Sequence, residues 1–253
     1  MRVFLAASCS GVNETDRKTV IVNNPPLYLL ETFYNGPKIC NKVLNDVGRE
    51  NFLMDSGAFT FVHSKKHITH KELDLFVEQQ IQFINDYDIK YFFEMDVDQT
   101  LGLSKVEELR KRIEQRTQKQ VIPVWHVERG VEYFKNMCKE YDYIAIGGMV
   151  VGKNLTIDQI KKLVTYAREK NVKVHGLGFT QFKYINEIPW YSVDSCTWSK
   201  VAFLGGKICW FNGHTIKMRP IVKNGYKLNL SKVCAYNFSE WIKYQKYMNL
   251  QRW

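Results

Sequence analysis

Three aspartates in this 253-residue chain directly follow short apolar runs of the kind that form β-strands. They are Asp55 after residues 52–54, Asp96 after residues 91–95, and Asp194 after residues 191–193. A retaining displacement at a sugar anomeric carbon needs one carboxylate as nucleophile and a second group to transfer protons. The chemistry that these residue types suggest is therefore the cleavage or exchange of a glycosidic bond.

Other polar residues and glycines also stand directly after apolar runs. They are His126 after residues 121–125, Gly147 and Gly148 after residues 143–146, and His175 and Gly176 after residues 172–174. Taken singly, an aspartate there is as often a turn former, a glycine can serve a turn, and a histidine can be a hydrogen-bonded core residue. The carboxyl ends of parallel barrel strands share one face, so the joint placement predicts a common pocket.

The elements that must position these residues alternate between strands and amphipathic helices. Strands are predicted at 3–7, 52–54, 91–95, 121–127, 143–146, 172–177, 191–193 and 201–204. Eight strands alternating with helices predict an α/β fold, a (β/α)8 TIM barrel, as a single domain over residues 1–253. A doubly wound open sheet is the alternative, but the segment SCSGVNETDRK after the first strand lacks a Gly-rich phosphate loop.

Several helices between these strands have recognisable boundaries. Capping-box spacing occurs at Thr69 with Glu72 and at Ser104 with Glu107. Thr156 predicts the start of a third helix that runs to about residue 170. Further helices are predicted over 37–47, 131–141 and, at the C-terminus, about 237–250.

The composition indicates a basic protein of a reducing compartment. With 36 Lys and Arg against 26 Asp and Glu, the net charge is +10, which favours nucleic acid as a partner. The six cysteines include no C-x-x-C pair, so we expect neither a metal site nor a disulfide framework. The N-terminal apolar run is shorter than a signal-peptide core, and no segment has the length of a membrane span. These features predict a cytoplasmic protein without cofactors or membrane contact.

Four segments resemble motifs of the tRNA-guanine transglycosylases, in the order of that family and across about residues 50–200. LMDSGAF at 53–59 resembles D-S-G-G-[FY], GGMVVGK at 147–153 resembles G-G-L-A-V-G-E, HGLG at 175–178 resembles M-G-V-G, and SVDSCTW at 192–198 resembles the run that holds the nucleophile. Together these short motifs are fairly specific, and the family folds as a (β/α)8 barrel.

The resemblance implies double displacement, with Asp194 as the nucleophile and Asp55 as the general acid/base. Cys196 is a conceivable rival nucleophile, but a thiol has no advantage at an anomeric carbon. Asp96 would accept hydrogen bonds from the Watson–Crick edge of guanine, and Phe59 and His175 would lie on opposite faces of the base. The full base-binding set implied by the resemblance is Asp96, His126, Gly147, Gly148, Met149, Phe59, His175 and Gly176.

Departures from the family change the expected substrate. The chain lacks the zinc spacing C-x-C-x-x-C and is shorter than the tRNA enzymes, so it looks more like the compact DNA-guanine transglycosylases found in phages and bacterial modification clusters. The expected partners are DNA and a free 7-deazaguanine base. A lysine at 153, where the family has glutamate, favours 7-cyano-7-deazaguanine.

A guanine in duplex DNA must be flipped out or presented in a single strand, and helper proteins could supply the strand opening. The residues predicted to contact the nucleic acid are Lys65, Lys66, Lys200, Lys207, Lys217 and Arg219. By contrast, residues 110–112 are expected to form a solvated helix face. The C-terminal residues Trp241, Tyr244 and Met248, at helical spacing, favour packing on the barrel over clamping nucleic acid.

Three other functions fit parts of the sequence. The reaction could use tRNA, in a queuosine or archaeosine pathway, in place of DNA. A catalytically inactive nucleic-acid-binding barrel would explain the charge and the aromatic content. A barrel enzyme for phosphorylated metabolites is disfavoured, because no Gly-rich segment follows the late strands.

Overall fold

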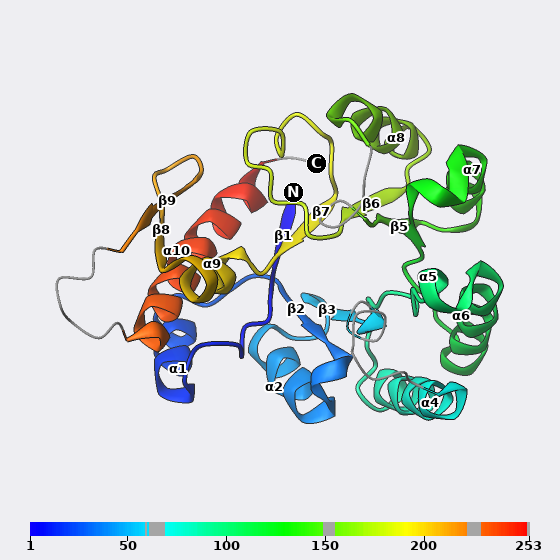
Figure 1. The fold of residues 1–253 in the computed structure, drawn as a ribbon, viewed down its shortest axis with the longest axis horizontal. Coiled ribbons are helices and arrows are strands. Elements are labelled where there is room, and N and C mark those ends of the chain that lie inside the picture. The colour runs from blue at the N-terminus through cyan, green and yellow to red at the C-terminus, as the bar shows by residue number, and fades with distance from the viewer. Residues whose placement is uncertain (59, 61–68, 149–154, 222–228, 252–253) are drawn as a thin grey trace.

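The computed structural model describes residues 1–58, 60, 69–148, 155–221 and 229–251. Within these residues, seven parallel strands form one curled sheet in the order β3-β2-β1-β7-β6-β5-β4 (Figure 1). The strands are β1 (Arg2–Ala6), β2 (Leu29–Thr32), β3 (Phe52–Asp55), β4 (Val124–Trp125), β5 (Tyr143–Ile146), β6 (Lys173–Gly176) and β7 (Ser192–Ser195). The two edges of this sheet belong to β3 and β4.

Residues 92 and 93 join these two edges. Met54 of β3 forms a parallel bridge with Phe92, and Phe93 forms one with Ile122, just before β4. The Phe93 N–H donates to the Met54 carbonyl at 3.0 Å, and the Ile122 N–H donates to the Phe92 carbonyl at 2.8 Å. Over the described residues the chain therefore forms a closed parallel α/β barrel, which confirms the predicted fold class.

Helices cover the outside of this barrel (Figure 1). They are α1 (Glu14–Asn23), α2 (Pro37–Val47), α4 (His70–Asp86), α5 (Asp98–Leu101), α6 (Leu103–Thr117), α7 (Gly130–Glu140), α8 (Ile157–Glu169), α9 (Thr197–Gly205) and α10 (Leu230–Leu250), with short 3-10 turns η1 (Phe33–Asn35) and η2 (Val127–Arg129). Between β6 and β7, where residues 177–191 are all described, the chain forms turns and no helix. In the described part of the chain, none of the helices has the length and apolar character needed to cross a membrane.

Strand alternation divides the apolar side chains into two cores. One core fills the barrel and includes Phe4, Leu30, Leu53 and Phe93. The other lies between the sheet and its helices, where the neighbouring strand residues and the apolar helix faces meet. An inward or outward position along a strand therefore decides whether a polar residue faces the barrel axis or the helical layer.

Two of the predicted helix starts are confirmed and one is wrong. Thr69 and Thr156 cap α4 and α8 through reciprocal capping boxes, with Glu72 and Gln159 as partners. Ser104 caps nothing, because α6 already begins at Leu103 after Gly102, whose φ of +80° turns the chain between α5 and α6. The predicted helix over 37–47 coincides with α2.

Within the barrel, the predicted strand set contains one error and one omission. Residues 201–204 lie in α9, because a short apolar run does not by itself distinguish a buried strand from a helix. The omitted strand is β2, whose sequence LLET pairs in parallel with both β1 and β3. A β-hairpin of β8 (Lys207–Phe211) and β9 (Ile216–Pro220) was also not predicted, and it packs outside the barrel against α10.

Helix α10 begins at Leu230, earlier than the predicted 237, and lies along β1, α1 and α9. Trp241, Tyr244 and Met248 are each about 1% exposed, so they pack as core. The Gln245 side chain joins the helix to the barrel wall: it accepts from the Leu27 N–H at 2.6 Å and donates to the carbonyls of Val3 and Tyr28, both at 2.6 Å.

Replacing Gln245 with Ala is expected to lower the free energy of unfolding by about 3 kcal/mol, because it leaves these buried backbone groups without a partner. Lys232→Ala, at an exposed position of the same helix, is the control and should change it by less than about 0.5 kcal/mol. Urea denaturation of both variants measures the difference. Equal stabilities would show that the amide does not hold α10 on the barrel.

Candidate active site

The carboxyl ends of the barrel strands bring the predicted acids to one mouth. The β2–β3 register places Asp55 beside Thr32, two residues beyond the inward-facing pair Leu30 and Leu53. The β1–β7 register places Asp194 beside Phe4, whose ring lies inside the barrel. Residues opposite one another on parallel strands face the same side, so both carboxylates point toward the barrel axis.

Asp55 is a partly buried carboxyl group whose protonation state can change near neutral pH. It accepts a hydrogen bond from the Gly57 N–H at 3.1 Å. Burial raises the pKa of Asp55 to about 6, and the negative charges of Asp194 and Asp96 contribute in the same direction, against the hydrogen bonds from Thr32 and Gly57. The charges of Asp96 and Asp194 thus affect the pKa of Asp55, as expected for three acids at one barrel mouth.

Asp194 is held by donors from the segment that follows β6. The N–H of Gly178 donates to its Oδ1 at 2.7 Å, and Nε2 of His175 lies 3.1 Å from the same oxygen. Gly178 has a φ of +64°, a left-handed conformation that favours glycine, and this turn places its N–H over the end of β7. The side chain of Asp194 remains 13% exposed at the mouth.

The prediction that His175 lies against a bound base is wrong. Its side chain is fully buried inside the barrel, where the ring centroids of Phe4 and Phe93 lie 6.1 and 5.1 Å from that of the imidazole. A nucleobase cannot stack on a ring that has no exposed surface. The contact of His175 is instead with the candidate nucleophile.

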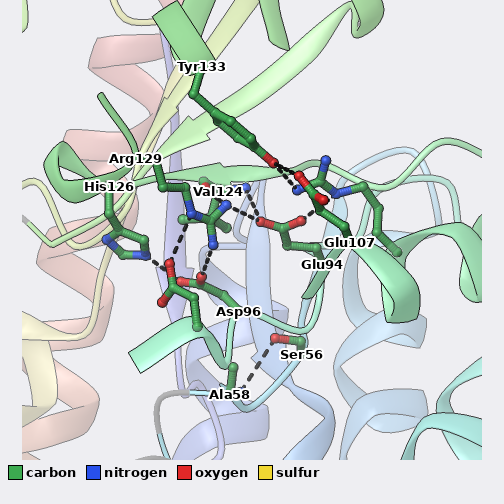
Figure 2. Close-up of polar contacts among 11 residues, drawn as sticks. Ser56, Ala58, Glu94, Asp96, Glu107, Val124, His126, Arg129 and Tyr133 are labelled. Atoms are coloured by element: carbon green, nitrogen blue, oxygen red, sulfur yellow. Dashed lines mark hydrogen bonds and ion pairs between the residues drawn. The ribbon is translucent and has the colours of Figure 1, made fainter. Parts of the chain in front are cut away.

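Asp96 lies in a polar network with His126 and Arg129 (Figure 2). In the order of the strands around the barrel, residues 92 and 93, which precede Asp96, lie across from β7, which holds Asp194. His126 Nε2 lies 2.5 Å from Asp96 Oδ2, and Arg129 Nη2 donates to Oδ1 at 2.8 Å. Burial disfavours the charged imidazole, but the hydrogen bond to Asp96 and the charges of Asp96 and Asp98 raise the pKa of His126 overall. Both oxygens of Asp96 are therefore oriented by cationic or polarised donors.

Arg129 is the centre of this network, and the sequence analysis did not identify it. Its side chain is 2% exposed and forms ion pairs with Glu94 at 3.0 Å, Asp96 at 2.8 Å and Asp98 at 2.9 Å. Its guanidinium also donates to the Val124 carbonyl. The charged Glu94 inside the apolar run YFFEM is the sequence signal that could have indicated a buried cationic partner.

Glu94 extends the network outward to α6. It faces the helical layer, because Phe93 faces the barrel interior, and Arg110 donates to it at 2.6 Å. Arg110 also donates to the Tyr133 hydroxyl, which donates in turn to Glu107. The expectation of a solvated face at residues 110–112 is therefore wrong for Arg110, whose side chain is 8% exposed.

The glycines predicted to bind a base have different surroundings. A Cβ at Gly147 would lie 2.5 Å from His126 Cε1, so only glycine lets the imidazole take its place beside Asp96. Gly148 is exposed at the mouth, next to the same ring. Gly176 faces away from the mouth and packs against Trp190 and Phe179 in the outer layer, so its predicted contact with a base is wrong.

The predicted nucleic-acid contacts are dispersed. Lys200 and Lys207 are exposed, on α9 directly after β7 and at the start of β8. Lys217 and Arg219 are exposed on β9, in the hairpin on the flank of the barrel, and not on a segment that directly follows a barrel strand. Phe59, Lys65, Lys66, Met149 and Lys153 lie outside the described residues.

Asp96, Asp98 and His126 each offer one ligand atom, and these atoms lie within 4.8 Å of one another. That spacing could hold a cation. Arg129 already binds both carboxylates, so its guanidinium supplies the positive charge that the two acids need.

The chain is an α/β-barrel protein with an acid-lined mouth, and comparisons with known proteins agree on the fold. No protein-family model and no curated protein sequence matches it. The solved structure of "QR15, an Aldolase" is similar over 78% of this chain and 89% of its own, with 13% identity and a TM-score of 0.50. A putative fructose-1,6-biphosphate aldolase from Coccidioides immitis is similar over 98% of this chain and 89% of its own, with 8% identity and a TM-score of 0.54. At these identities the likeness shows the barrel fold alone.

The raised pKa of Asp55 predicts a pH-dependent effect of Asp55→Asn on stability. Because the pKa is about 6 in the folded protein and 3.8 ordinarily, the stabilising contribution of Asp55 is complete below about pH 4 and is lost as the pH rises through about 6. The stability of the Asn variant relative to wild type should therefore increase by up to about 3 kcal/mol between pH 4 and pH 7.5. Urea denaturation at both pH values measures it, and a difference that does not change with pH would contradict the assignment.

Arg129→Met is expected to lower the free energy of unfolding by about 3–5 kcal/mol, because Asp96 and Asp98 lose a buried counter-charge. Arg112→Met is the matched control, since Arg112 pairs with the partly exposed Asp74 at 2.6 Å and its loss should cost at most about 1 kcal/mol. Chemical denaturation of the two variants gives the comparison. Similar costs would show that Arg129 is not the centre of the network.

Proposed function

We propose that this barrel is an enzyme, a guanine transglycosylase that exchanges guanine in DNA for a 7-deazaguanine. The observation that carries the proposal is that Asp55 and Asp194 face one mouth in different environments. Asp194 is oriented by two donors, whereas burial and neighbouring charge raise the pKa of Asp55 to about 6. Carboxyl groups of unequal character are what a retaining exchange at an anomeric carbon requires.

In the proposed reaction, a carboxylate oxygen of Asp194 attacks C1′ of the flipped nucleotide. The bond from C1′ to N9 of guanine breaks, its electron pair stays on the base, and Asp55 donates the proton that the departing base takes up. The incoming 7-deazaguanine then returns a proton to Asp55, and its nitrogen attacks C1′ and displaces Asp194. The pKa of about 6 allows Asp55 to donate and accept this proton near neutral pH.

Asp96, His126 and Gly148 are the proposed base-binding group on the other side of the mouth. Each oxygen of Asp96 already accepts one hydrogen bond, but an ionised carboxylate has about four acceptor positions. It can therefore also accept from N1–H and the exocyclic amine of guanine. The ion pair with Arg129 would hold the carboxylate in the orientation that this bidentate contact needs.

DNA is the proposed substrate because of the net charge of +10 and the resemblance to the compact DNA enzymes. Lys200 and Lys207, which closely follow the Asp194 strand, are the candidates for phosphate contacts among the described residues. Flipping the nucleotide costs a few kcal/mol in a duplex, so a single-stranded target should react faster. The proposed incoming base is 7-cyano-7-deazaguanine, on the sequence evidence of residue 153.

The proposal is tested by incubating the protein with labelled guanine and either single-stranded DNA, duplex DNA or tRNA, and measuring label in the polymer. We expect exchange into DNA, and Asp194→Asn should reduce it by more than about 10³-fold and abolish any covalent adduct. Asp142→Asn, an exposed aspartate before β5, is the control and should keep full activity. Exchange only into tRNA would show that the substrate is tRNA and not DNA. Full activity of Asp194→Asn would contradict the proposed function.

A further inference from the structure

A chain of hydrogen bonds runs from Asp194 into the barrel interior. Nε2 of His175 lies 3.1 Å from Asp194 Oδ1, and its Nδ1 lies 2.7 Å from the hydroxyl of Ser192. That hydroxyl lies 2.5 Å from the hydroxyl of Tyr143. The four residues come from β5, β6 and β7, and both His175 and Ser192 are fully buried.

Only some arrangements of the protons give every polar atom in this chain a hydrogen bond. An ionised Asp194 offers no proton, so Nε2 of His175 must donate. Burial raises the pKa of Tyr143, so the phenol keeps its proton and can donate to Ser192. The Ser192 proton is then available to Nδ1, and every polar atom in the chain gives or receives a hydrogen bond when the imidazole carries its proton on Nε2 alone.

The chain also makes the two oxygens of Asp194 different. Oδ1 accepts from both Gly178 and His175. Among the hydrogen bonds of the described residues, none uses Oδ2. Because Oδ1 is fixed by donors from two positions, rotation of the carboxylate is restricted and Oδ2 is the oxygen left to react.

We infer that His175 is a positioning residue that presents Oδ2 of Asp194 as the attacking atom, and that Ser192 and Tyr143 fix its tautomer. This inference rests on the proposed function for its catalytic consequence, but its structural content does not. His175 does not touch the substrate, since it is buried beneath the carboxylate. Its effect should appear in the rate of the covalent step and not in substrate binding.

The tautomer can be measured without any assay of activity. In ¹⁵N-histidine-labelled protein at neutral pH, we expect the Nε2-protonated tautomer of His175, identified by loss of its signals in His175→Gln. Tyr143→Phe keeps the ring packing but removes one donor, and Ser192→Ala removes the partner of Nδ1; both should shift the Nδ1 resonance. A ring protonated on Nδ1 in the wild-type protein would overturn the inference, whatever the enzyme does.

The positioning effect is tested by two amide substitutions in the base-exchange assay. Gln can place an N–H near the position of Nε2, whereas the shorter Asn can mimic only Nδ1. We expect His175→Asn to lower kcat by about 10²-fold with little change in KM, because a misplaced nucleophile slows the chemical step. His175→Gln should recover most of that loss. Equal kcat values for both variants, or a change confined to KM, would contradict the role.

Failure of the proposed function and failure of the positioning role of His175 would give different experimental results. If the wild-type protein exchanges no base but its His175 carries the proton on Nε2, the proposed function fails and the hydrogen-bonded chain stands. If exchange occurs and depends on Asp194, but the tautomer or the Gln and Asn comparison disagrees, the positioning role fails and the function stands. Thermal unfolding of each variant, together with Tyr143→Phe as the least disruptive change, separates loss of fold from loss of position.

Discussion

The cost of gathering negative charge at one barrel mouth is the constraint on which the rest of this site depends. Barrel closure fixes the acids there, because the carboxyl ends of all the strands share one face. The structure accommodates the charge in three ways. Arg129 and Arg110 form ion pairs with Glu94, Asp96 and Asp98, backbone and imidazole donors hold Asp194, and Asp55 has a raised pKa. Asp55, Asp96 and Asp194 thus have distinct environments, although all three reach the mouth by the same topology, whereas Glu94 faces the helical layer.

These environments divide the acids by what they can do chemically. A carboxylate bound by a buried guanidinium is fixed in position and charge, which suits recognition of a ligand and not proton transfer. Asp55 has no arginine partner among the described contacts, and its pKa of about 6 allows it to exchange protons near neutral pH. Asp194 accepts hydrogen bonds at Oδ1 and, among the described residues, none at Oδ2, which suits its proposed role as the nucleophile. The proposed roles follow from the neighbours of each acid.

The sequence predicted the fold class and the strand ends that bear the acids, because periodicity and capping are local properties. It did not predict Arg129, since the three acids that it binds lie more than thirty positions away and no local pattern marks the pairing. The same limit explains the errors at His175 and Gly176. Alternation along β6 and its pairing with β7 decide which side each residue faces, and these depend on register. The missed β2 is a four-residue strand that is buried by its neighbours, so its own sequence carries little signal.

The departure from the regular barrel repeat lies beside Asp194, the proposed nucleophile. After the other strands of the seven-stranded barrel sheet a helix follows, but after β6 the chain turns at Gly178 and continues through turns to β7. A helix beginning directly after β6 would direct its first N–H groups along its own axis. The turn instead directs the Gly178 N–H at Asp194 Oδ1, beside the bond from His175. The turn that replaces a helix here and the buried His175 are therefore parts of one arrangement, which holds Oδ1 of Asp194 and leaves Oδ2 without a donor among the described residues.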